Sequence, residues 1–161
     1  MQYNLTVAIL GAGSEVGQLI AQKIALKYPL LLMDNSEEKL NQVKELVVKN
    51  HPTAQVEMVV CSKDASWEGD IIIIAADQIG EQEAIATKIN EVTTCKTVIQ
   101  IKQASSDTVT LQNILPYSKF ISVDWAITAA IVEGNDESSL SITGEIVQLC
   151  GLKPIFKKSL I

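Results

Sequence analysis

The fold is decided by the stretch Leu5-Thr6-Val7-Ala8-Ile9-Leu10-Gly11-Ala12-Gly13-Ser14-Glu15-Val16-Gly17, in which an apolar strand runs into a glycine-rich turn that opens a helix. We expect Gly11 to allow the tight turn, Gly13 to let the backbone approach a phosphate, and Gly17 to let the helix pack closely on the sheet. The N-terminus of that helix would present unpaired N–H groups and a partial positive charge. The pattern predicts a phosphate-binding turn, although its spacing, G-x-G-x-x-x-G, is one residue longer than the usual G-x-G-x-x-G.

The residues after this turn strengthen the prediction. Apolar side chains recur at helical spacing in the order Val16, Leu19, Ile20 and Ile24. A second apolar run then ends in Asp34, about twenty residues after the glycines, where a carboxylate that binds ribose hydroxyls is expected. Two simpler interpretations stay open: the glycines only shape a turn, or Asp34 is a turn or capping residue before the next helix.

Composition limits the function classes. The chain has 161 residues, enough for one domain, which we expect to span 1–161. Its net charge of −6 and pI near 4.8 argue against a nucleic-acid or anionic-membrane partner, so phosphate must be bound by backbone N–H groups. The widely separated Cys61, Cys95 and Cys150 are expected to be buried apolar residues in a reducing compartment. No apolar run is long enough to span a bilayer, and we expect a cytoplasmic protein.

Strands and helices alternate along the whole chain. Strands are predicted over 5–10, 29–34, 54–61, 70–76, 96–101, 119–123, 129–133 and 154–156, with a turn over 67–70. Helices are predicted after the glycine turn, from Ser36 to the His51-Pro52 pair, and over 80–92, 106–115 and 137–150. This order predicts an α/β protein with a doubly wound, mostly parallel sheet in three layers, which is the Rossmann fold.

Ligands of such sheets bind at the carboxyl ends of the strands, which places the site in the turns after Leu10, Asp34, Ala76 and Ile101. The residues predicted to bind a dinucleotide there are Gly11, Ala12, Gly13, Ser14, Glu15, Val16, Asp34, Asn35, Ala75, Ala76 and Asp77.

Five segments together resemble a known family. They are residues 7–13 (VAILGAG), 69–76 (GDIIIIAA), 96–101 (KTVIQI), 130–137 (AIVEGNDE) and 150–154 (CGLKP). The chain resembles the dinucleotide-binding domain of NADP oxidoreductases that use the deazaflavin coenzyme, a group close to the 6-phosphogluconate dehydrogenase type. The resemblance implies NAD(P) binding and hydride transfer, with a deazaflavin or flavin as a further cofactor.

The sequence departs from that family at two places. NADP-selective members carry Ser or Thr and an Arg after the second strand, where this chain has Asp34-Asn35-Ser36. Because an aspartate repels a 2′-phosphate and accepts hydrogen bonds from ribose hydroxyls, we expect NAD to be preferred over NADP. The family's Val-Pro after the fourth strand is replaced by Ala76-Asp77, so the Asp77 carboxylate must point away from a pyrophosphate.

Catalytic residues are not evident. The one histidine, His51, is expected in a loop away from the cleft. The acid–base and stacking candidates near strand ends are Asp77, Lys102, Asp124 and Trp125. A deazaflavin passes hydride without a protein acid or base, so their weakness does not exclude that chemistry. No metal-ligand spacing occurs.

Several functions therefore stay open. The first is an NAD(P)-binding oxidoreductase with a small-molecule substrate, in which a homodimer partner closes the site or the chain is only a module. The second is a non-catalytic dinucleotide sensor or interaction module. An S-adenosylmethionine methyltransferase is disfavoured because Ile9 stands where that class has an acid. An extended short-chain dehydrogenase is disfavoured because Ser14 replaces its middle glycine and Tyr117 lacks a lysine four residues later.

Overall fold

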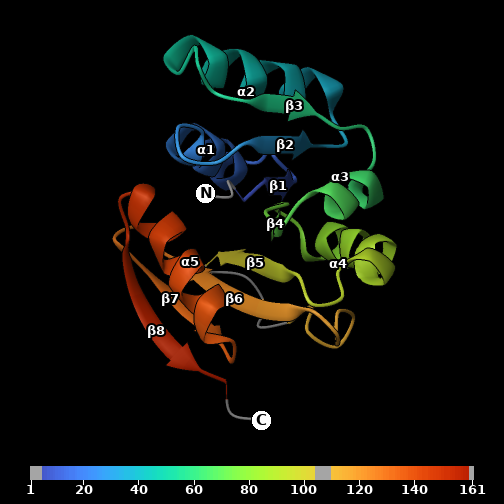
Figure 1. Cartoon of the computed structure of the whole chain (residues 1–161), viewed down its shortest axis with the longest axis vertical. Coiled ribbons are helices and arrows are strands. Elements are labelled where there is room, and N and C mark those ends of the chain that lie inside the picture. The colour runs from blue at the N-terminus through green and yellow to red at the C-terminus, as the bar shows by residue number, and fades with distance from the viewer. Residues whose placement is uncertain (1–4, 104–109, 160–161) are drawn as a thin grey trace.

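The computed structural model describes residues 5–103 and 110–159 and contains an eight-stranded sheet in the order β3-β2-β1-β4-β5-β6-β7-β8 (Figure 1). Its strands are β1 (Val7–Leu10), β2 (Leu30–Met33), β3 (Val56–Met58), β4 (Ile71–Ile74), β5 (Thr97–Gln103), β6 (Lys119–Trp125), β7 (Ala129–Gly134) and β8 (Lys153–Lys158). All neighbouring strands are parallel except β6 and β7, which are antiparallel. The predicted α/β class with a mostly parallel sheet is confirmed.

Helices cover both faces of the sheet. The helices are α1 (Glu15–Ile24), α2 (Glu37–Asn50), α3 (Ser62–Glu68), α4 (Ile79–Ile89) and α5 (Glu137–Leu149), and a short 3-10 helix, η1 (Asn90–Val92), follows α4. Buried side chains of α1, α2 and α5 join one hydrophobic cluster, and those of α3 and α4 join a second cluster on the other face. The fold therefore has three layers, as predicted, and α5 lies over β6 to β8 (Figure 1).

The central strands explain why the sequence shows continuous apolar runs. Every residue of β1 and β4 is buried, and successive side chains of β1 enter opposite clusters. A parallel strand that is covered on both faces carries no polar alternation. β1 lies between β2 and β4. The chain continues from β1 to β2 and β3 on one side, and then crosses to β4 on the other side of β1. This arrangement opens a crevice at the carboxyl ends of these three strands.

Helix ends follow the sequence signals closely. The Ser36 hydroxyl caps α2 by accepting a hydrogen bond from the N–H of Lys39, and α2 ends two residues before Pro52. The Asp136 carboxylate caps α5 in the same way. Gly151 follows α5 with a φ of +85°, a conformation that favours glycine.

One predicted strand is too long and one helix was not predicted. The strand predicted over 54–61 covers only Val56–Met58, and helix α3 (Ser62–Glu68) lies where no helix was expected and includes the first half of the turn predicted over 67–70. Its buried residues, Ser62, Ala65 and Ser66, are too small to give an apolar signal. The Lys96 Nζ donates hydrogen bonds to three carbonyl oxygens at the end of α3, a long-range cap that a sequence pattern does not reveal.

The helix predicted over 106–115 is absent from its described part, since 110–115 forms turns and 106–109 lies outside the described residues. Leu111 and Leu115 are nevertheless buried beside α4, because the turn folds back onto the sheet. Strong apolar positions therefore mark burial here and not helical structure.

The cysteine prediction holds for one residue of three. Cys150 is buried, and burial raises the pKa of its thiol to about 12. Cys61 and Cys95 are exposed, because they lie in the turn before α3 and in the tight turn before β5. No helix in 5–103 or 110–159 is long and apolar enough to cross a membrane.

Candidate functional site

The glycine turn is fixed between two strands. The N–H groups of Gly11 and Ala12 both donate to the carbonyl oxygen of Met33, at 2.9 and 3.0 Å. Gly11 has a φ of +86°, and a Cβ atom there would lie 2.5 Å from the backbone nitrogen of Ala76. Only glycine combines this conformation with this close approach, so Gly11 forms the tight turn as predicted.

Ser14 ties the turn to the next strand and caps α1. Its Oγ accepts a hydrogen bond from the N–H of Gly17 at 2.9 Å and donates one to the carbonyl oxygen of Ala75 at 2.6 Å. A Cβ atom at Gly17 would lie 2.5 Å from the Gly11 carbonyl oxygen. The third glycine therefore lets α1 pack against its own turn and not against the sheet, and the extra residue of the motif places it in the first turn of the helix.

Two backbone N–H groups at this helix start have no acceptor among the described residues. The N–H of Gly13 donates to Asp34, that of Ser14 to the Gly11 carbonyl, and that of Gly17 to Ser14. Within 5–103 and 110–159 no acceptor pairs with the N–H of Glu15 or Val16, the first two residues of α1. Two unpaired N–H groups at the positive end of a helix dipole form a suitable site for a phosphate group.

The Asp34 carboxylate is held in place by the backbone on its inner side. Its Oδ2 accepts from the N–H of Gly13 at 2.7 Å, and its Oδ1 accepts from the N–H of Ser36 at 2.8 Å. A Cβ at Gly13 would lie 2.7 Å from Oδ2, so this glycine makes room for the carboxylate. Asp34 is therefore a turn residue as well as a site candidate, whereas the helix cap is Ser36.

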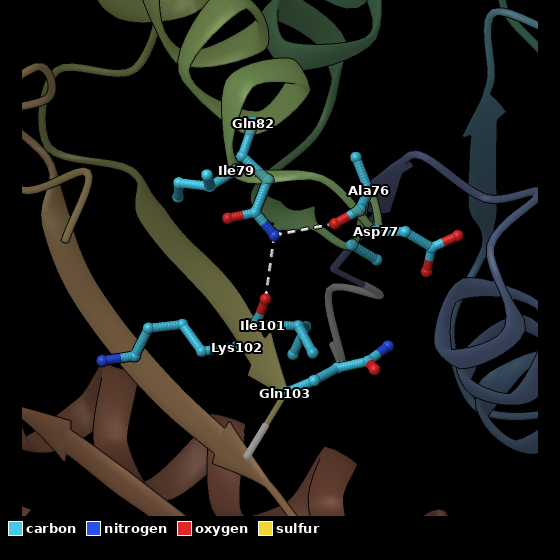
Figure 2. Close-up of a pocket in the computed structure, with 8 residues that line it drawn as sticks. Ala76, Asp77, Ile79, Gln82, Ile101, Lys102 and Gln103 are labelled. Carbon is cyan, nitrogen blue, oxygen red and sulfur yellow. Dashed lines mark hydrogen bonds between the residues drawn. The ribbon is translucent and has the colours of Figure 1, made fainter. Parts of the chain in front are cut away.

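A shallow pocket lies between the ends of β4 and β5 and the start of α4. It is lined by Ala75, Ala76, Asp77, Ile79, Gln82, Ile101, Lys102 and Gln103 (Figure 2). The Gln82 Nε2 donates to the carbonyl oxygens of both Ala76 and Ile101, at 2.9 Å each. Figure 2 shows the amide inserted where the two strands diverge, in place of a direct strand-to-strand bond. Three residues predicted to bind the dinucleotide, Ala75, Ala76 and Asp77, therefore line this pocket together. Gln82 also lines it but was not among the predicted site residues.

Gln82 belongs to a buried polar network. The Gln100 Nε2 donates to the Gln82 Oε1 at 3.0 Å, and the Gln100 Oε1 accepts from the N–H of Leu111. Both glutamine side chains are buried, so loss of one partner would leave polar atoms unpaired. The network holds the strand ends that shape the pocket.

The acid–base candidates do not form one cluster. Lys102 and Asp124 are opposite each other on β5 and β6 and form an ion pair at 3.4 Å, with the Lys102 side chain 14% exposed. In Figure 2 the Lys102 ammonium and the Asp77 carboxylate point to opposite sides of the pocket. His51 contacts the Gln22 carbonyl oxygen at 3.1 Å, at the end of α2, so it lies outside the site as expected.

A larger groove begins at the same helix start. It encloses about 940 Å³ and runs from the first turn of α1 to the β6–β7 connection and the end of α5. Its lining is mainly apolar and comprises Glu15, Val16, Leu19, Gln103, Trp125, Ala126, Ile127, Thr128, Cys150, Gly151 and Leu152. Trp125 was predicted to lie near a strand end, but the groove itself joins segments too distant for a sequence pattern to connect.

Comparison with known proteins identifies the fold. No protein-family model matches the sequence, and no curated protein matches it significantly. Solved structures do match. An imine reductase variant from Myxococcus stipitatus in complex with NAD+ has a TM-score of 0.77 at 10% identity, over 97% of this chain and 55% of that chain. The (S)-3-hydroxybutyryl-CoA dehydrogenase PaaH1 from Ralstonia eutropha has a TM-score of 0.72 at 14% identity, over 98% and 65%.

A third match is closer in length. A protein assigned as an F420-dependent NADP-reductase, from an Arthrobacter species, has a TM-score of 0.75 at 15% identity, over 97% of this chain and 86% of that chain. The chain spans less than two thirds of the other two. The fold is a Rossmann fold. At these identities the similarity establishes the fold and leaves the activity to be argued from the site.

Within 5–103 and 110–159 no group of three His, Cys, Asp or Glu side chains could hold a metal ion.

Proposed function

We propose that the crevice at the carboxyl ends of β1, β2 and β4 binds a nicotinamide dinucleotide, with NAD preferred over NADP, for hydride transfer to or from a second reactant. One observation carries the proposal. The Asp34 carboxylate, held by two backbone N–H groups, lies beside a helix start whose first two N–H groups have no acceptor in the described chain. A diphosphate on the helix start and a ribose on Asp34 would satisfy both features.

The geometry at Asp34 favours NAD. Each carboxylate oxygen accepts one backbone hydrogen bond on its inner side, which leaves acceptor capacity for the two hydroxyls of a ribose. A 2′-phosphate would meet this anion at hydrogen-bonding distance, where like charges repel. The exposed Lys39 lies close to this turn, because its Cβ is 2.9 Å from the position that a Cβ at Gly13 would take.

Two hollows flank the proposed diphosphate site, and Gln103 lines both of them. The nicotinamide supplies or accepts the hydride when it is bound. The apolar groove beside α1 suits the second reactant, a small molecule or the ring of a deazaflavin or flavin. The Lys102–Asp124 ion pair offers an ammonium proton at Nζ beside the shallow pocket.

A non-catalytic dinucleotide sensor is the second candidate. The observation that favours it is the separation of the polar groups: Lys102 is paired with Asp124 and points away from Asp77. Such a module would use the same dinucleotide site without turnover.

The test is calorimetric titration of the purified protein with NAD, NADH, NADP and NADPH, and with S-adenosylmethionine as a control. We expect NAD and NADH to bind more tightly than their phosphorylated forms and S-adenosylmethionine not to bind. Preference for NADP would show that Asp34 does not face the ribose. No binding at millimolar concentration would overturn the proposal. Binding of NADH without oxidation by any screened acceptor would favour the sensor.

A further inference from the structure

One side-chain hydrogen bond crosses the crevice. The Asn35 Nδ2 donates to the Glu81 Oε1 at 3.0 Å, although the residues are 46 positions apart. Asn35 lies two residues beyond β2, and Glu81 lies in the first turn of α4, which follows β4. Because β1 lies between β2 and β4, this bond passes across the carboxyl end of β1.

The bond adds little to the fold. It is solvent-exposed, and an exposed hydrogen bond largely replaces equivalent bonds to water. The pair does not hold a cap either, since Ser36 caps α2 and Gln78 at the start of α4 makes no side-chain capping bond. Its position across the crevice therefore suggests a role in ligand binding.

The residue next to Glu81 supports this interpretation. Gly80 is exposed, and among the described residues a Cβ atom there would meet nothing within 4 Å apart from its chain neighbours and its own helix backbone. Its φ lies outside the range that requires glycine, and glycine in a helix is less favourable than alanine. Neither packing nor backbone geometry explains this glycine, whereas a flat surface beside the crevice would let a planar ring approach the helix.

We propose that Asn35 and Glu81 recognise the adenine base of the dinucleotide, and this rests on the proposed function. With the diphosphate on α1 and the ribose hydroxyls on Asp34, the base extends toward the residue after Asp34 and across to α4. The 6-amino group of adenine donates to the Glu81 carboxylate, and N7 of the ring, an acceptor in adenine and hypoxanthine alike, accepts from the Asn35 amide. Each side chain exchanges its present partner for the complementary group of the base, so no polar atom is left unpaired.

The proposal predicts discrimination at a single position of the base. Hypoxanthine carries an oxygen in place of the 6-amino group, and that oxygen would face the Glu81 carboxylate acceptor to acceptor. We expect wild-type protein to bind NADH about tenfold or more tightly than its hypoxanthine analogue, since a hydrogen bond to a charged group is replaced by a repulsive contact. Glu81→Gln should abolish most of this preference, because the glutamine amide can donate to the oxygen.

The experiment is calorimetric titration of both dinucleotides into wild type, Glu81→Gln and Glu83→Gln. Glu83 lies two residues after Glu81 on α4, so Glu83→Gln is the control that removes the same charge at a different position. Glu83→Gln should keep the wild-type preference. Gly80→Ala should weaken NADH binding without lowering the melting temperature, because among the described residues its methyl group meets only its chain neighbours and its own helix backbone.

Equal binding of the two dinucleotides by wild type, or an unchanged preference in Glu81→Gln, would overturn base recognition while leaving dinucleotide binding intact. If neither dinucleotide binds to any of the proteins, the proposed function itself fails, and base recognition fails with it.

Discussion

Asp34 is the residue on which the site depends most. Its carboxylate accepts hydrogen bonds from Gly13 and Ser36 and so links the glycine turn to the start of α2. A side chain that is already fixed in place loses little rotamer entropy when it binds a ligand. The sequence position of Asp34 predicted a ribose contact, but its bond to Gly13 came only from the structure.

We expect Asp34→Ala to weaken NADH binding by about 1.5–3 kcal/mol, roughly tenfold to a hundredfold, because it removes a charged acceptor for the ribose hydroxyls. Asp70→Ala is the matched control. Asp70 also accepts a backbone hydrogen bond, from Thr6 at 2.8 Å, but at the amino ends of β1 and β4, opposite the proposed site. Calorimetry should show NADH affinity lost in the first variant and kept in the second; equal affinities in both would refute the ribose assignment.

Ser36→Arg should shift the preference toward NADP, because a guanidinium placed next to Asp34 can pair with a 2′-phosphate. The variant also loses the hydroxyl that caps α2, which costs about 1 kcal/mol. Ser36→Ala loses the same cap without adding charge, so it isolates the electrostatic effect. The ratio of NADPH to NADH affinity should rise only in the arginine variant, and an unchanged ratio would contradict the assignment.

At the scale of elements, helix starts carry much of the local stabilisation. The carboxylate of Asp136 accepts hydrogen bonds from the hydroxyls of Ser138 and Ser139 and from the Ser139 N–H. These bonds lower the pKa of Asp136 from 3.8 to about 2. The unfolded chain therefore takes up this proton more readily. The stabilisation is fully present above about pH 4 and is lost as the pH falls through 2.

Asp136→Ala should lower the melting temperature by about 2–4 °C at pH 7, as expected for the loss of one N-cap in a chain of this size. The difference from wild type should shrink as the pH falls from 5 to 2. Asp136→Asn also removes the titrating group but keeps a capping side chain, so the difference between the asparagine and alanine variants should not change with pH. Thermal unfolding at several pH values tests this, and an alanine offset that is constant with pH would contradict the charged cap.

Elements with strong local signals were predictable, and those fixed by distant contacts were not. β1 and β4 could be predicted because both faces are buried, which makes the sequence continuously apolar. α3 could not, since small residues bury its inner face and Lys96, about thirty positions away, holds its end.

The candidate site divides in the same way. The glycine turn and Asp34 follow from local spacing, because one strand, one turn and one helix bring them together. Gln82 and Glu81 gave no signal, since a lone glutamine or glutamate on a helix is ordinary. Glu81 meets Asn35 because β2 and β4 lie on either side of β1, and Gln82 bridges the ends of β4 and β5.

At the scale of the whole molecule, the sheet edge is protected against extension. β8 is the last strand of the described sheet and carries Lys153, Pro154, Lys157 and Lys158. Lysines and a proline on an edge strand disfavour pairing with another chain. A homodimer stays a prediction, and one that forms is expected to use a surface other than this edge.

The compact fold predicts how the three cysteines react. Cys61 and Cys95 are exposed, while burial raises the pKa of Cys150 to about 12. A thiol reagent should therefore modify two cysteines rapidly in the native protein and the third only on unfolding. Mass spectrometry of the modified peptides would identify them. Rapid native modification of Cys150 would contradict the packing of α5 against the sheet.

The central claim is that the start of α1 and Asp34 together bind a nicotinamide dinucleotide. The most direct measurement is a titration of 15N-labelled protein with NADH, followed through its amide resonances. If NADH binds at the start of α1 and at Asp34, the largest shifts will fall on the N–H groups of Glu15 and Val16. Further shifts are expected at Gly13, Asn35 and Asp77. Shifts confined to the amino ends of the strands, such as at Thr53 to Gln55 before β3, would contradict dinucleotide binding at this site, and so would the absence of shifts at millimolar NADH.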